Sequence, residues 1–116
     1  MRNPDWSEDE EILLVDLYCE LMKQNKDITH STQELKELSD LLRSHAVKSG
    51  VEVSETYRNL NGLIMKCHNL SSIIDGKGLG HTSTKAQSVI NMMLNNPQIL
   101  HNKAEQIKRE WGIVDK

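Results

Sequence analysis

The chain has 116 residues, of which 37% are apolar and 27% charged, and its formal net charge at pH 7 is -3. This length fits one domain with a modest core and excludes a large enzyme with a second catalytic domain. Its apolar runs fall far short of the roughly 18 residues that span a bilayer, and its N-terminus does not resemble a secretion signal. We therefore expect a cytoplasmic protein with no membrane partner.

The charge is unevenly distributed. Residues 1–30 carry three basic and eight acidic side chains, whereas the stretch from Arg58 to Lys85 carries four basic residues, two histidines and a single carboxylate. The net negative charge argues against a polycation that binds nucleic acid over its whole surface. An anionic partner would instead dock on the 58–85 stretch.

Two helices are predicted in the first half of the chain. Ser7 and Glu10 form a capping box, in which hydroxyl and carboxylate accept hydrogen bonds from free backbone N–H groups, at the start of a helix over 8–24. Its apolar residues recur at helical spacing: Leu14, Leu17, Tyr18, Leu21 and Met22.

Ser31 and Glu34 repeat the capping-box pattern before a stripe of four leucines. This pattern predicts a second helix of about three turns that ends near Ser44. We interpret residues 45–58 as a loop.

A third helix is predicted from Asn59, its N-cap, to Ile74. One side carries apolar residues three and four apart: Leu60, Leu63, Ile64, Cys67, Leu70 and Ile74. The opposite side carries amides, a glycine, a methionine and a lysine: Asn61, Gly62, Met65, Lys66 and Asn69. Glycine is unusual inside a helix, so Gly62 either allows a close approach or is simply tolerated.

Two further helices follow the glycine loop at 76–80. The fourth begins at Ser83 or Thr84 and directs five apolar residues inward: Ala86, Val89, Ile90, Met93 and Leu94. The fifth is capped by Asn96 and begins with Pro97. Its apolar stripe is Leu100, Ala104, Ile107 and Trp111. The prediction is therefore an all-α single domain over 1–116 with about five helices. A helix-turn-helix-like trihelical core covers 1–75, and a C-terminal helix pair follows over 76–116.

The sequence offers no catalytic constellation. The histidines never recur at the i, i+4 spacing of a helical metal site, and the loop at 76–80 lacks the Gly-Lys-Ser/Thr of a phosphate-binding loop. Cys19 and Cys67 are far apart and form no CxxC motif, so we expect two buried thiols. We predict no enzyme activity in this chain, no metal and no cofactor.

The outer side of the third helix is the best candidate for binding. Amides can pair with adenine edges, and Arg or Lys can reach guanine or phosphate. The residues alone support equally a solvated face in which Asn61 only assists the helix cap.

Two resemblances bear on this choice. Trp6-Ser7-Glu8-Asp9-Glu10-Glu11 with the leucines that follow is similar to the first helix of Myb/SANT-type domains. The segment from Arg58 to Leu70, with Gly76-Lys77-Gly78-Leu79 and the opening Arg2-Asn3-Pro4-Asp5-Trp6, resembles the N-terminal domain of bacterial McrA-like, modification-dependent HNH restriction endonucleases. That family carries R-N-x-N-G-x-x-M-K-x-x-N followed by G-K-G-L; here Leu60 stands where it often has proline.

The resemblance implies a module that binds double-stranded DNA beside a separate HNH nuclease domain. It does not imply nuclease activity here, because this chain has no His-Asn-His motif. The predicted DNA-binding residues are Arg58, Asn61, Gly62, Met65, Lys66, Asn69 and Lys77, with Arg58, Lys66 and Lys77 on phosphates and the two asparagines on bases. The alternative is a protein-interaction module that uses the acidic first helix or the Met92-Met93 region.

Overall fold

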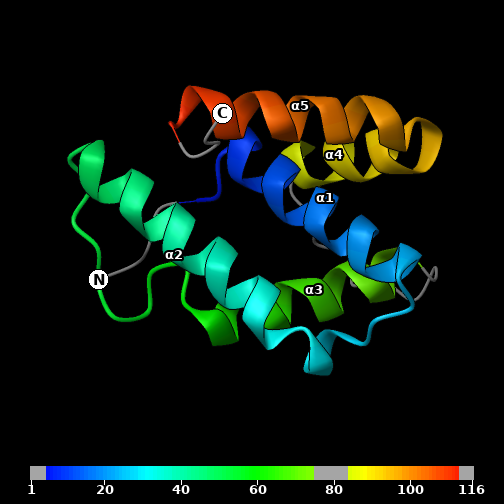
Figure 1. The fold of residues 1–116 in the computed structure, drawn as a ribbon, viewed down its shortest axis with the longest axis horizontal. Helices are drawn as coiled ribbons and strands as arrows, with labels where there is room; N and C mark the ends of the chain where they lie inside the picture. The colour runs from blue at the N-terminus through cyan, green and yellow to red at the C-terminus, as the bar shows by residue number, and fades with distance from the viewer. Residues whose placement is uncertain (1–4, 75–83, 113–116) are drawn as a thin grey trace. The chain divides into compact units, whose positions relative to one another are not determined.

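The computed structural model describes residues 5–74 and 84–112. Over these ranges it contains five α-helices and no strand, which confirms the predicted all-α class (Figure 1). The helices are α1 (Glu8–Lys23), α2 (Thr32–Lys48), α3 (Leu60–Ile74), α4 (Thr84–Asn95) and α5 (Pro97–Glu110), with a short 3-10 turn at Ile28–His30. No helix in the described ranges is long and apolar enough to cross a membrane.

The start of α1 confirms the first capping box. Ser7 N donates to Glu10 Oε1 at 2.8 Å, and Glu10 N donates to Ser7 Oγ at 3.1 Å. Four acidic residues occupy the first turn, where the positive end of the helix dipole favours them. The sequence signal here is local, so the prediction needed no tertiary information.

α1 and α2 end in the same way. After α1, Asn25 adopts a positive φ of 57°, and Lys26 N donates to Leu21 O at 2.9 Å. After α2, Gly50 has φ 85°, and Val51 N donates to Ala46 O at 2.9 Å. Both are Schellman motifs, in which a left-handed residue lets the following N–H groups satisfy the last free carbonyls.

Both boundaries of α2 correct the sequence prediction. Ser31 makes no side-chain cap; its Oγ donates to Asp27 O at 2.8 Å, and Glu34 pairs instead with Lys26. The preceding 3-10 turn supplies these competing partners. The helix also continues past Ser44 to Lys48, because Ala46 is buried and the left-handed residue that ends the helix comes only at position 50.

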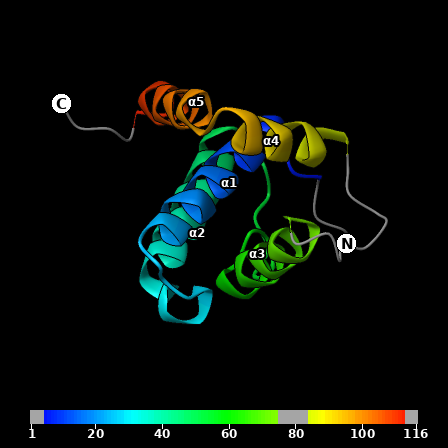
Figure 2. The same ribbon diagram turned by 90° about the vertical axis from the view of Figure 1, so that its right-hand side faces the viewer.

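The described chain divides into two units. One contains Asp5 and residues 21–74, in which α2 packs on α3; the other contains residues 6–20 and 84–112, in which α4 packs on α5 (Figure 2). The predicted grouping placed all of the first three helices in one core over 1–75. In the structure the division falls within α1, after Glu20. Four consecutive apolar residues of α1, at 12–15, are buried rather than a single stripe.

Each unit has its own apolar core. In the first it is Leu21, Ile28, Leu35, Leu38, Leu42, Ala46, Tyr57, Leu63, Cys67 and Leu70; in the second it is Ile12, Leu13, Leu14, Val15, Tyr18, Ala86, Val89, Ile90, Met93, Leu100, Ala104 and Ile107. Leu94, predicted to point inward, is 58% exposed, and Met22, which the sequence pattern places at helical spacing with buried residues, is 40% exposed. Both lie in the last turn of their helices, at the edge of the apolar stripe.

Candidate nucleic-acid interface

The segment between α2 and α3 is fixed by side chains of α2. Arg43 donates from one guanidinium nitrogen to Tyr57 O at 2.6 Å and to Ser54 O at 3.1 Å. The buried Ser39 Oγ donates to Arg58 O at 2.7 Å. Three backbone carbonyls of an irregular segment are thus satisfied, so the start of α3 has a defined position on α2.

Arg58 lies at this junction and is buried, with 6% of its surface exposed. It adopts a left-handed φ of 47°, its Nη2 donates to Asp5 O at 3.1 Å, and its guanidinium lies 4.4 Å from the centre of the Tyr57 ring. The predicted site placed it at the edge of the outer side of α3. In the structure its guanidinium is instead buried and bonded to the N-terminal segment.

Asn59 is the N-cap of α3, as the sequence predicts. Its Oδ1 accepts a hydrogen bond from Gly62 N at 2.8 Å. A Cβ atom at position 62 would lie 3.0 Å from the same oxygen, so this glycine accommodates the capping side chain. The cap belongs to Asn59, which leaves Asn61 exposed for another role.

We define the exposed face of α3 as Asn61, Gly62, Met65, His68 and Asn69, all of which are exposed. At about 100° per residue, these five positions fall within a third of a turn of one another. Lys66 is half-buried and flanks this face, while Leu63, Cys67 and Leu70 point into the core. The structure therefore places four of the five predicted residues between 61 and 69 on this face, with Lys66 beside it, and adds His68.

The electrostatics of α3 suit an anionic ligand. The helix has no Asp or Glu among its 15 residues and carries one lysine and one histidine. Its N-terminus also presents the positive end of the helix dipole. Met65, 66% exposed, places an apolar side chain among these polar groups.

The predicted pair of buried thiols is confirmed only for Cys67, because Cys19 is half-buried. Burial raises the pKa of the Cys67 thiol to about 11, so it stays protonated at neutral pH. A protonated, buried thiol is neither a nucleophile nor a metal ligand. Cys67 therefore packs in the apolar core beneath the exposed face.

Two predicted features fall elsewhere. Lys77 and the glycine loop at 76–80 lie outside the described residues. Of the alternative interaction regions, Met93 is buried and Met92 half-buried. On the first helix, Glu10 and Glu11 are buried, whereas Glu8 and Asp9 are exposed. His68 was not among the predicted site residues, although it lies seven positions, two helical turns, after Asn61.

Comparison with known proteins gives no further guidance: no family model, curated protein or solved structure matches this chain.

Proposed function

We propose that this chain binds double-stranded DNA through the exposed face of α3. The observation that carries the proposal is the stripe of exposed amides, Asn61 and Asn69, on a helix that has a lysine and no carboxylate. An α-helix fits the major groove, where Asn can pair bidentately with adenine and Lys can reach guanine or phosphate.

Each residue of the face then has a distinct role. Asn61 and Asn69, two turns apart, read base edges; Lys66 reaches a phosphate beside the groove. Met65 contacts an apolar base edge such as the thymine methyl group. Gly62 is given no base contact, because the space beside it holds the capping oxygen of Asn59. Arg58 is left out of the contacts because it is buried, and its role is to hold the entry to α3.

The test is fluorescence anisotropy of labelled duplexes with the full chain, at salt concentrations from about 50 to 200 mM. We expect Lys66→Ala to weaken binding to all duplexes alike and to make the slope of log K against log salt shallower by about one. Lys103→Ala, an exposed lysine on α5, is the matched control and should leave the slope unchanged.

Sequence discrimination is tested separately, by selection from random duplexes. Asn61→Ala should reduce discrimination at one base position by about 1–3 kcal/mol, whereas Asn91→Ala, an exposed amide on α4, should not. If folded Lys66→Ala and Asn61→Ala bind DNA like the parent, or if the parent binds no duplex, the proposal is wrong. Binding of a protein partner that is unaffected by substitutions on α3 would then favour the interaction module.

A further inference from the structure

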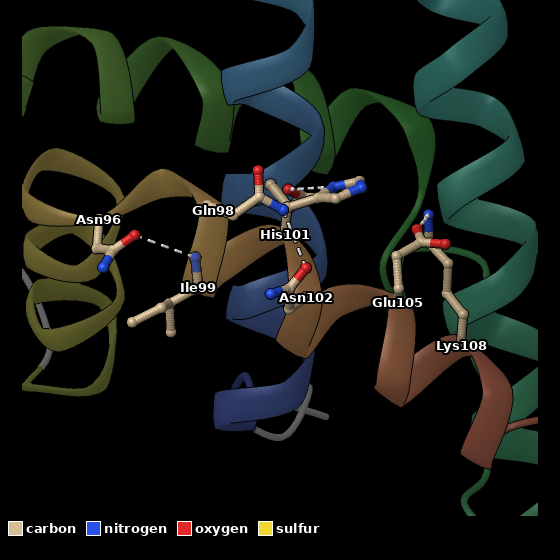
Figure 3. Close-up of polar contacts among 8 residues, drawn as sticks. Asn96, Gln98, Ile99, His101, Asn102, Glu105 and Lys108 are labelled. Atoms are coloured by element: carbon tan, nitrogen blue, oxygen red, sulfur yellow. Dashed lines mark hydrogen bonds and ion pairs between the residues drawn. The ribbon is translucent and has the colours of Figure 1, made fainter.

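A second polar cluster lies on the unit that does not contain α3. Asp16 and Glu20 are one turn apart on α1, and His101 comes from α5; one ligand atom from each lies within 4.8 Å of the other two. His101 Nδ1 is 3.2 Å from Asp16 Oδ1 and 3.3 Å from Oδ2. Figure 3 shows His101 among the polar side chains of α5, with the dashed contact from its ring.

The carboxylate of Asp16 in this cluster is buried. Only 7% of the Asp16 side chain is exposed, so its carboxylate is largely shielded from water. A buried carboxylate requires a positive partner. A bound dication would supply positive charge together with a direct bond to the carboxylate oxygen.

The donor set suits a metal ion, and the spacing of Asp16 and His101 is compatible with a shared ion, with Glu20 within 4.8 Å of both. Zn²⁺ binds carboxylate oxygen and imidazole nitrogen at about 2.0–2.2 Å, which places two tetrahedral ligands about 3.3 Å apart. That is the separation observed between Asp16 and His101. With 39% of its side chain exposed, His101 leaves an entry path, and water can complete the coordination.

We propose that Asp16, Glu20 and His101 bind a divalent transition-metal ion, best matched by Zn²⁺. Magnesium and calcium fit poorly, since both prefer six or more oxygen ligands to an imidazole. The ion would join α1 to α5 within one unit, next to the Lys108–Glu105 pair, whose ammonium and carboxylate are 3.3 Å apart. This proposal is independent of DNA binding, because none of its residues lies on α3.

Isothermal titration of the tag-free full chain with ZnCl₂ near pH 7.5 tests the site. We expect one ion per chain, and little heat from MgCl₂. Glu20→Gln keeps the Asp16–His101 contact and should weaken Zn²⁺ binding by at least about tenfold, because loss of even an outer-shell partner costs about 10–100-fold. The matched controls Glu37→Gln and His30→Gln, both exposed on the other unit, should bind like the parent.

NMR of the imidazole side chains separates a metal site from a simple ion pair. Substoichiometric Zn²⁺ should shift the ring resonances of His101 and leave those of His30 in place. His101→Gln, checked for folding by circular dichroism, should abolish the stoichiometric site. If the ring of His101 responds to pH but not to Zn²⁺, or if Glu20→Gln binds like the parent, the cluster is an ion pair and the proposal fails.

Discussion

The amide oxygen of Asn59 accepts a hydrogen bond from the backbone N–H of Gly62 at 2.8 Å, and a side chain on residue 62 would meet that same oxygen at 3.0 Å. The cap and the glycine are therefore coupled. Glycine lowers the helix propensity of α3 by about 1 kcal/mol relative to alanine, and the cap stabilises the helix by a similar amount.

This coupling predicts a non-additive mutant cycle. Asn59→Ala should reduce the free energy of unfolding by about 1 kcal/mol. Gly62→Ala should be close to neutral in the parent, since its gain in propensity is offset by the displaced cap, but should stabilise the Asn59→Ala variant by about 1 kcal/mol. Urea denaturation of the four proteins measures the cycle. Equal effects of Gly62→Ala in both backgrounds would show that the two residues are not coupled.

Arg58 should matter for stability through both its side chain and its backbone. Arg58→Ala removes the contacts to Asp5 and Tyr57 while keeping the left-handed φ, and it should lower the free energy of unfolding by about 2 kcal/mol or more. Arg58→Gly removes the same contacts but relieves the strained φ. It should therefore be about 1 kcal/mol more stable than Arg58→Ala. Thermal or urea unfolding of the pair checks this order, and the reverse order would contradict the backbone assignment.

Cys67 should make the protein sensitive to alkali. Its pKa is about 11 when folded, above the ordinary value of 9.0, so the folded state keeps the thiol proton that the unfolded state loses. Its contribution to stability is complete below pH 9 and declines as the pH rises towards 11, by roughly 2–3 kcal/mol in total. Cys67→Ser lacks this ionisation.

The measurement is the free energy of unfolding from urea titrations at pH 8, 9 and 10. The parent should lose more stability over this range than Cys67→Ser, whatever their difference at pH 8. Cys19→Ser, which changes the half-buried thiol, is the control. Parallel pH profiles for parent and Cys67→Ser would exclude a buried, proton-retaining thiol.

The helices were predictable where their signals are local. The caps at Ser7, Asn59 and Asn96 each depend on residues within one turn, and each is present in the structure; Asn96 Oδ1 accepts from Ile99 N at 3.3 Å (Figure 3). The predicted cap at Ser31 does not form, because the Ser31 hydroxyl donates to Asp27 O and the Glu34 carboxylate pairs with Lys26. Gly50 could have located the end of α2, since a glycine two residues past the last helical position is typical of a Schellman motif.

The candidate sites were predictable only in part. Helical periodicity alone places Asn61, Met65 and Asn69 on one face. The burial of Arg58 depends on Asp5, 53 residues earlier in the chain, and the contact of His101 depends on Asp16, 85 residues earlier. Sequence spacing carries no information on such pairings, although two acids one turn apart, Asp16 and Glu20, were a partial signal for the second cluster.

One continuous helix, α1, belongs to both units, with residues up to Glu20 in one and Leu21 onwards in the other. Backbone hydrogen bonds from residue i to i-4 therefore cross the division, and a helix of this length does not persist as two short halves in water. A cut there does not separate the units, because residues 84–112 belong to the same unit as residues 6–20. We expect a single melting transition. Limited proteolysis that cleaves within α1 should leave no folded fragment.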